Sequence, residues 1–215
     1  MIKGIIFDLD GVLVSTDEMH YLAWKRLADE LGITGFNRED NWRQRGVSRM
    51  ASLEVVLEKS DKTYTEEEKT ELAERKNGYY LELLKDMDNS AVLNGVYGAL
   101  ETLKRRNLLL AVGSASKNAP LILEKTGLLP YLNQVSCGLD TTKSKPDPEV
   151  FLVAARKLQL APAQCLVVED SAAGIEAAKA GGMRSLAVGP FFQSLGGDFA
   201  APSLGEVANW DEVLA

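Results

Sequence analysis

Short runs that are apolar at nearly every position occur at the start of the chain and again throughout its second half. Runs of this kind are apolar on both faces, as expected of parallel strands buried between two layers of helices. The clearest runs span residues 4–9, 108–113, 165–168 and 184–189, and a weaker one spans residues 133–138. The pattern therefore predicts the strands of a parallel sheet.

Helical patterns separate the later runs. We expect helices at residues 96–106, 118–126, 148–158 and 171–180, and a last one near residues 209–214. Asp147 is expected to cap the third of these helices, with Pro148 in its first turn, and the fourth follows Ser171 and stops at Gly181-Gly182. Strands that alternate with helices predict an α/β fold with a doubly wound, Rossmann-like parallel sheet.

The interval between the first and second predicted strands breaks this alternation, because it is much longer than a single crossover helix requires. It is predicted to be helical at residues 17–31, 49–59 and 65–86. Thr65 and Glu68 match the capping box of the last of these helices.

This long interval predicts a second domain, inserted into the first. We expect an α/β core domain made of residues 1–14 and 94–215, and a helical cap domain of residues 15–93. The chain would re-enter the core domain at Asn94-Gly95.

Composition then narrows the possible functions. The chain has 215 residues, of which 26% are charged and 46% hydrophobic, as is typical of a soluble globular enzyme. Its net charge of −7 argues against a nucleic-acid partner and against anionic membrane surfaces. An anionic ligand would therefore need positive charges placed locally around it.

The chain has only two cysteines, Cys137 and Cys165, and one histidine, His20, so a zinc site or a disulfide framework is not expected. The first apolar run contains Lys3 and reaches Asp8 too soon for a signal peptide, and no stretch has the length of a membrane span. We expect a cytoplasmic protein, and a monomer because the predicted cleft is complete within one chain.

Polar side chains stand at the ends of successive predicted strands. They are Asp8 and Asp10 after the first strand, Ser114 after the second, Lys145 in the loop after the third, and Glu169 and Asp170 after the fourth. Ligands of open α/β sheets bind beyond the carboxyl ends of the strands. We therefore expect these side chains to converge on one edge of the sheet.

The residue types at this edge suit a metal ion and a phosphoryl group. Carboxylate oxygens are the ligands that Mg²⁺ prefers, and Ser114 and Lys145 suit the non-bridging oxygens of a phosphate. Asp8 and Asp10 would share a face if the first strand continued through them. One of the two would then stay ionised as a nucleophile, and the other would carry a proton.

Each of these features also has a plainer explanation. Asp8 and Asp10 could belong to a solvated turn, Glu169 and Asp170 could stabilise a helix N-terminus, and Lys145 could be an ordinary loop lysine. Their joint placement at the ends of successive strands favours the phosphoryl-transfer site.

Four segments of the chain resemble the motifs of the haloacid dehalogenase superfamily. They are FDLDGV (7–12), VGSAS (112–116), KSKPDP (143–148) and VVEDSAAGIEAAKAGG (167–182). The resemblance implies that Asp8 is the phosphorylated nucleophile and Asp10 the acid/base. It further implies that Ser114 and Lys145 hold the phosphoryl group. The implied Mg²⁺ ligands are Asp8, Glu169, Asp170 and the carbonyl of Asp10, and the insertion corresponds to the helical cap of that superfamily.

Longer stretches are similar to the sugar phosphomutases of this superfamily, which interconvert β-glucose 1-phosphate and glucose 6-phosphate. They include residues 17–33, 45–58, 73–80 and 114–125. The implied substrate-binding residues are His20, Trp24, Gly46, Val47, Arg49, Ser52, Lys76, Asn77, Ser116, Lys117 and Asn118. The implied cofactors are Mg²⁺ and β-glucose 1,6-bisphosphate as primer. Ser15, where an acidic residue is usual, and Asn94, where proline is common, depart from that pattern.

A separate argument from residue types supports a mutase. A phosphatase needs one phosphate site, whereas a mutase that works through a bisphosphate needs two. Arg49, Lys117 and Asn118 offer a second anion site, although Trp24 could be a packing residue and the lysines could be solvated. The alternatives are a sugar-phosphate phosphatase of the same superfamily, a phospho-accepting signalling receiver and a non-enzymatic Mg²⁺ binder.

Overall fold

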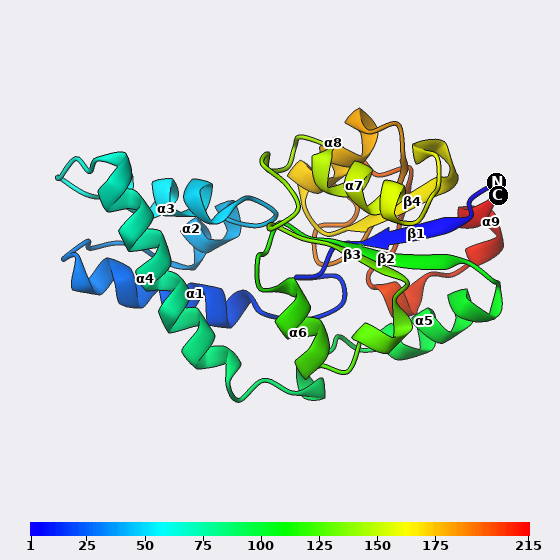
Figure 1. Cartoon of the computed structure of the whole chain (residues 1–215), viewed down its shortest axis with the longest axis horizontal. Coiled ribbons are helices and arrows are strands. Elements are labelled where there is room, and N and C mark those ends of the chain that lie inside the picture. Colours follow the sequence, from blue (N-terminus) through cyan, green and yellow to red (C-terminus); the bar gives the residue numbers. More distant parts are fainter.

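The computed structural model describes residues 1–215 and has two parts, a sheet with helices on both faces and a group of helices beside it (Figure 1). The sheet has six parallel strands in the order β3-β2-β1-β4-β5-β6. The strands are β1 Gly4–Phe7, β2 Leu109–Gly113, β3 Gln134–Ser136, β4 Cys165–Glu169, β5 Arg184–Ala187 and β6 Phe199–Ala200. Strands β2 and β3 lie on one side of β1, and strands β4, β5 and β6 lie on its other side. This order confirms the predicted doubly wound fold.

Alternate residues of β1 explain the layers on either side of the sheet. Ile5 and Phe7 belong to an apolar cluster with α5, α6 and α9, whereas Ile6 belongs to a second cluster with α7 and α8. These helices are α5 Val96–Arg105, α6 Ala119–Lys125, α7 Glu149–Lys157, α8 Ala172–Ala180 and α9 Trp210–Leu214. Because side chains of a strand point alternately to its two faces, this short strand holds both helix layers.

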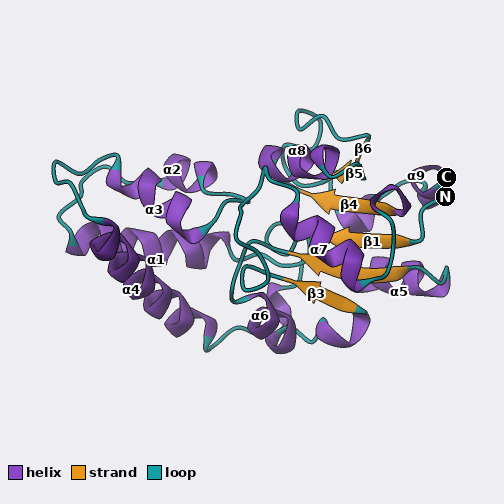
Figure 2. Ribbon diagram, turned by 45° about the horizontal axis from the view of Figure 1, so that its top comes forward, coloured by secondary structure: helices purple, strands orange, loops and turns teal.

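The second part consists of four helices between β1 and β2. They are α1 Asp17–Glu30, α2 Arg38–Arg43, α3 Arg49–Leu57 and α4 Glu66–Leu84. Their apolar faces form a core of their own, which includes Trp24, Leu53 and Leu72. Figure 2 shows these helices standing beyond the ends of the strands. The predicted capping box of α4 is present, with Thr65 N donating to the Glu68 carboxylate at 2.7 Å.

Two chain segments connect the parts, and they run side by side. Val14 and Val92 form an antiparallel bridge. Ser15 N donates to the Ala91 carbonyl at 2.9 Å, and Leu93 N donates to the Leu13 carbonyl at 3.0 Å. The insertion thus leaves and re-enters the sheet part at one place, while the domain bounds at residues 14–15 and 93–94 stay a prediction.

Some local features differ from the sequence-based expectation. Strand β1 ends at Phe7 rather than at residue 9, and α7 begins at Glu149, one residue after Pro148. The Asp147 carboxylate still accepts a hydrogen bond from Glu149 N at 3.0 Å, so it caps the helix from one residue farther away. Helix α2 and strand β6 were not predicted, because both are very short.

Short 3-10 turns complete the chain at Asn89–Ala91, Leu129–Tyr131, Pro162–Gln164 and Leu204–Glu206. Both cysteines are buried as free thiols. None of the helices combines the length and the apolar character that crossing a membrane requires.

Candidate active site

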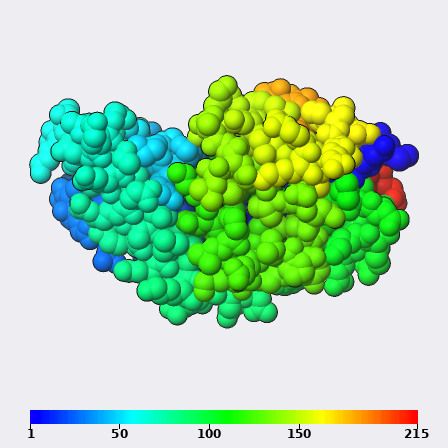
Figure 3. All heavy atoms as spheres, viewed as in Figure 1, coloured from blue at the N-terminus to red at the C-terminus, as the bar shows by residue number.

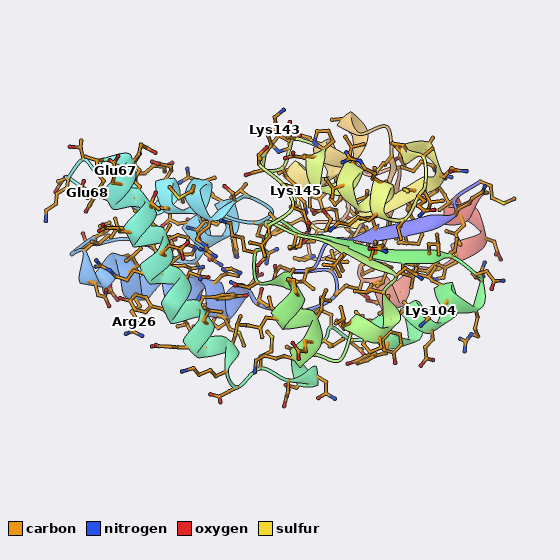
Figure 4. The ribbon with its side chains drawn as sticks, viewed as in Figure 1. Arg26, Glu67, Glu68, Lys104, Lys143 and Lys145 are labelled. Carbon is orange, nitrogen blue, oxygen red and sulfur yellow. The ribbon has the colours of Figure 1, made fainter.

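The strand ends bring the predicted core residues together. Lys145 Nζ lies 2.6 Å from Asp8 Oδ1 and 2.6 Å from Glu169 Oε1. The side chains of Lys145 and Glu169 are both 0% exposed, which makes this an ion-paired group enclosed by protein. Figure 4 shows Lys145 at the end of the sheet that faces the helical part. The predicted convergence of Asp8, Lys145 and Glu169 is therefore present.

Local hydrogen bonds hold these side chains in place. The Glu169 carboxylate accepts from both the backbone N and the Oγ of Ser171, each at 2.8 Å. After β2, Ser114 Oγ accepts from Ser116 N at 3.1 Å, which turns the chain into α6. Because these bonds come from residues only two positions away, the sequence itself fixes the orientation of Glu169 and Ser114.

Asp10 reaches the site by a turn and not along the strand. The chain leaves β1 after Phe7, and Gly11 has a positive φ of 86°. Asp10 pairs with Val14 in an isolated bridge, and its carboxylate accepts a hydrogen bond from the Thr16 hydroxyl. The condition that the first strand continues through Asp10 is therefore not met. Both aspartates nevertheless line one cavity.

The carboxyl groups of Asp8 and Asp10 are harder to ionise than usual. Burial and the nearby carboxylates of Glu169 and Asp10 raise the pKa of Asp8 in spite of Lys145. Burial raises the pKa of Asp10 to about 6, although the hydrogen bond from Thr16 opposes this shift. Burial acts against a charged Lys145, but the carboxylates of Asp8 and Glu169 outweigh it and raise the pKa of Lys145. Lys145 therefore stays protonated.

Three carboxylates of the site could share a metal ion. One oxygen from each of Asp8, Glu169 and Asp170 can lie within 4.8 Å of the others, and all three residues are buried. A Cβ on Gly11 would come within 2.1 Å of Asp170 Oδ2, so only glycine lets this turn pass the carboxylate. A donor set of hard oxygens with excess negative charge fits Mg²⁺. The Asp10 side chain is not part of this group, which leaves its carbonyl as the predicted ligand.

A cavity of about 550 Å³ lies between the sheet part and the helical part. Asp8, Asp10, Ser114 and Lys145 line it, whereas Glu169 and Asp170 do not. The eleven predicted substrate-binding residues also line it: His20, Trp24, Gly46, Val47, Arg49, Ser52, Lys76, Asn77, Ser116, Lys117 and Asn118. The outline of the molecule is notched where the blue-to-cyan helices meet the green-to-yellow sheet part (Figure 3).

One wall of the cavity joins the two parts through a shared hydrogen-bond acceptor. Asn77 Oδ1, on α4, accepts from Arg49 Nη2 at 2.9 Å and from Asn118 Nδ2 at 3.0 Å. Arg49 also pairs with Glu74 at 2.6 Å. Lys117 precedes Asn118 and is exposed at the cavity. Arg49, Asn77 and Asn118 thus form one polar group, the Arg49 group. It shares no hydrogen bond with the Lys145 group, which consists of Lys145, Asp8 and Glu169.

A second wall carries a buried lysine. Lys76 Nζ lies 2.8 Å from His20 Nδ1 and 4.5 Å from the centre of the Trp24 ring. His20 stacks on Tyr80 with ring centroids 4.1 Å apart. Burial and the charge of Arg49 lower the pKa of Lys76 to about 7. Burial, followed by the charge of Lys76, lowers the pKa of His20, so a neutral imidazole accepts from Lys76.

Several residues at the site were not predicted from the sequence. Thr16 binds Asp10, Tyr80 stacks on His20, Ser171 binds Glu169, and Arg45 reaches Asp170. Thr16 and Ser171 lie six and two residues from the carboxylates that they bind, so a search for nearby hydroxyl groups could have found them. Tyr80 is far from His20 in the sequence, and no local signal pointed to their contact. Arg45 carried a weaker signal, as the cation next to Gly46 in the predicted cap loop.

Comparisons with known proteins agree with this geometry. A family model of haloacid dehalogenase-like hydrolases matches residues 2–182. A β-phosphoglucomutase of Bacillus subtilis is 40% identical over 198 residues, which cover 91% of this chain and 87% of that protein. A phosphorylated carbohydrates phosphatase of Thermotoga maritima is 30% identical over 86% of this chain and 83% of that protein.

Among solved structures, a β-phosphoglucomutase from Clostridium difficile superposes with a TM-score of 0.91. It is 34% identical and covers 99% of this chain and 96% of that one. The resemblance predicted from the four strand-end motifs is thereby confirmed, and with it the fold. The chain belongs to the haloacid dehalogenase-like hydrolase family.

Proposed function

We propose that the protein is a Mg²⁺-dependent β-phosphoglucomutase, which interconverts β-glucose 1-phosphate and glucose 6-phosphate. The observation that carries the proposal is the presence of two separate polar groups in one cavity, each with a cationic side chain that could bind a phosphate. Ser114 and Lys145 stand beside Asp8, whereas Arg49 and Asn118 meet at Asn77. A sugar with a phosphate at each end needs both groups, and a simple phosphatase needs only the first.

In the first half of the reaction, phosphorylated Asp8 donates its phosphoryl group to the 6-hydroxyl of β-glucose 1-phosphate. Asp10 removes the proton of that hydroxyl, and its pKa of about 6 leaves it mostly ionised at neutral pH. Ser114 and Lys145 hold the non-bridging oxygens during transfer. The products are β-glucose 1,6-bisphosphate and the free carboxylate of Asp8.

In the second half, the bisphosphate lies in the cavity with its 1-phosphate toward Asp8. The Asp8 carboxylate attacks this phosphorus, and Asp10 returns its proton to the departing sugar oxygen. Glucose 6-phosphate leaves, and Asp8 is phosphorylated again. Added β-glucose 1,6-bisphosphate would prime the cycle by the same half-reaction. When bound by Asp8, Glu169, Asp170 and the Asp10 carbonyl, Mg²⁺ would neutralise charge on the phosphoryl oxygens.

Water must be kept from phosphorylated Asp8 for transfer to win over hydrolysis. Residues 15–93 would act as a cap over the core made of residues 1–14 and 94–215, turning about the paired connecting segments. Among the contacts that link cap and core in the structure are two near the site. Asn118 binds Asn77, and a Cβ on Gly46 would lie 2.5 Å from Ser171 Oγ. The enzyme would act as a cytoplasmic monomer on a small sugar phosphate.

The test is a product balance on one sample of purified protein with Mg²⁺, β-glucose 1-phosphate and a trace of β-glucose 1,6-bisphosphate. Glucose 6-phosphate and inorganic phosphate are followed together by ³¹P NMR. A mutase converts almost all of the substrate to glucose 6-phosphate and releases almost no phosphate. Phosphate that rises in step with substrate loss would refute the mutase.

A sugar-phosphate phosphatase is the second candidate. One observation favours it: the Thermotoga maritima relative, 30% identical, is a phosphorylated carbohydrates phosphatase. The residues proposed for chemistry, Asp8, Asp10, Ser114 and Lys145, would serve either reaction equally well. The product balance described above separates the two activities directly.

A further inference from the structure

Arg45 has no part in the function proposed above, yet it lies beside the proposed metal ligands. It stands in the loop between α2 and α3. Its Nη2 donates to the Asp17 carboxylate at the start of α1, and its Nη1 lies 3.6 Å from Asp170 Oδ2. The Arg45 side chain is 19% exposed. Its buried Nε and Nη1 atoms make no hydrogen bond, so its bonding capacity is only partly used.

The backbone next to Arg45 lies against the core, which brings the Arg45 side chain close to Asp170. Gly46 has a positive φ of 71°. A Cβ at Gly46 would lie 2.5 Å from Ser171 Oγ, next to Asp170 in the chain. The loop therefore passes close to Ser171, and the Arg45 side chain beside it lies within 3.6 Å of Asp170. The position of the cap loop and the position of the guanidinium are therefore linked.

The charges around Asp170 indicate a role for the Arg45 guanidinium. Lys145 pairs with Asp8 and Glu169, and no ion pair joins it to Asp170. Arg45 is the one cationic side chain within 4.0 Å of the Asp170 carboxylate. Asp170 is 5% exposed, so water compensates little of its charge. Without a metal, Arg45 offsets this charge only in part, because burial and the charges of Glu169 and Asp8 still raise the pKa of Asp170.

The guanidinium also has room to withdraw. A second cavity, of about 410 Å³, is bordered by Asp17, Arg45 and Asp170. Arg45 and Asp17 line the first cavity as well, whereas Asp170 lines only the second. A cation could therefore reach Asp170 from the second cavity while Arg45 remains held by Asp17.

We propose that Arg45 is a built-in counter-cation that competes with the divalent metal ion for Asp170. Metal binding displaces the guanidinium toward Asp17 and loosens the contact of residues 44–48 with the core. The inference rests on the proposed metal site but not on the mutase reaction, and it makes Arg45 a positioning residue. Metal affinity and cap contact are then coupled through one side chain.

The test measures Mn²⁺ binding by electron paramagnetic resonance, without any sugar phosphate. Because a repelling charge is removed, R45Q is expected to bind Mn²⁺ about fivefold more tightly than the wild type. D17N frees Arg45 for Asp170, so we expect it to bind Mn²⁺ about fivefold more weakly. The double variant R45Q/D17N should bind like R45Q, since the effect of Asp17 passes through Arg45.

R43Q is the matched control, because Arg43 lies just before the same loop and pairs with Glu58 at the surface. Its Mn²⁺ affinity should stay within about twofold of the wild type. Unchanged or weaker Mn²⁺ binding by R45Q would overturn the proposal. So would a D17N effect of full size in the R45Q background, because Asp17 would then act by its own charge. A wild-type protein that binds no Mn²⁺ would remove the metal site itself.

A second measurement needs no variant. Hydrogen exchange of the wild-type protein is compared with and without Mg²⁺, again without sugar phosphate. The amides of residues 44–48 should exchange faster when Mg²⁺ is present, because the guanidinium no longer ties the loop to Asp170. Slower or unchanged exchange in this segment would contradict the competition.

Discussion

The two polar groups of the cavity are built in different ways. In the Lys145 group, the side chains of Lys145 and Glu169 are 0% exposed, and every member belongs to the sheet part. In the Arg49 group, the Arg49 side chain is 18% exposed and that of its partner Glu74 is 61% exposed. The Arg49 group also spans both parts, because Asn118 comes from the sheet part. The first group is fixed by the fold, whereas the second depends on how the cap lies.

This contrast bears directly on function. A preorganised set of charges around Asp8 suits the chemical step, which is the same in a phosphatase and a mutase. A group that forms only when cap and core meet suits recognition of the second phosphate and exclusion of water. The Arg49 group should therefore decide whether the phosphoryl group goes to a sugar or to water.

Replacing Asp8 should disrupt the Lys145 group but not the Arg49 group, and it should have the largest effect on turnover. Asp8→Asn removes the proposed nucleophile but keeps its shape, so turnover should fall by at least about 10⁴-fold, or more than about 5 kcal/mol. Binding of glucose 6-phosphate, measured by calorimetry, should change by less than about threefold, since the Arg49 group is intact. Turnover within tenfold of the wild type would exclude Asp8 as nucleophile.

Replacing Asp10 should have the next largest effect. Asp10→Asn cannot carry a proton, so kcat should fall by about 10²- to 10⁴-fold. Burial raises the pKa of Asp10 to about 6, and only its ionised form can accept the proton of the 6-hydroxyl. The kcat of the wild type should therefore decrease below pH 6, whereas the kcat of the variant should not decrease in this range. If the kcat of the variant decreased below pH 6 as well, a group other than Asp10 would be responsible.

Replacing Asp170 should have a smaller effect, which appears in stability. Burial and the charges of Glu169 and Asp8 raise the pKa of Asp170 from 3.8 to about 8. Between these values the folded protein holds a proton that the unfolded chain has lost, so this group makes the protein less stable as the pH rises. Asp170→Asn has no such proton.

The measurement is urea unfolding of the wild type and Asp170→Asn in EDTA at pH 5 and pH 8. The variant should gain about 1 kcal/mol or more of stability over the wild type between these two pH values. Comparing the two proteins cancels the titration of groups that do not interact with Asp170, such as His20. A stability difference independent of pH would show that the charge of Asp170 is already compensated.

The fold and the Lys145 group could be predicted because both depend on local patterns. Strand β1 is apolar throughout and β4 is apolar up to its last residue, Glu169, and the parallel strands end at one edge of the sheet. Asp8 and Glu169 follow directly from this rule. Lys145 does so less strictly, because a loop separates it from β3. The turn that brings Asp10 to the cavity could not be predicted, since a helix or strand period says nothing about a tight turn.

The family resemblance, together with the need of a mutase for a second anion site, pointed to members of the Arg49 group but not to their contact. Arg49, Asn77 and Asn118 lie on three elements that are far apart in the sequence, and no period or spacing brings them to one oxygen atom. The contact between Arg45 and Asp170 was missed for the same reason. It depends on the packing of two parts whose relative position the hydrophobic pattern does not encode.

The most direct test of this account is the ratio of glucose 6-phosphate to inorganic phosphate formed from β-glucose 1-phosphate by Arg49→Ala. Arg26→Ala is the control, because Arg26 lies on the outer side of the helical part, away from Lys145 (Figure 4). We predict that the ratio falls by about tenfold or more, equivalent to about 1.4 kcal/mol, in Arg49→Ala only. Release of phosphate from a simple phosphate ester should stay within about twofold. Equal losses of both activities would contradict the two-site account.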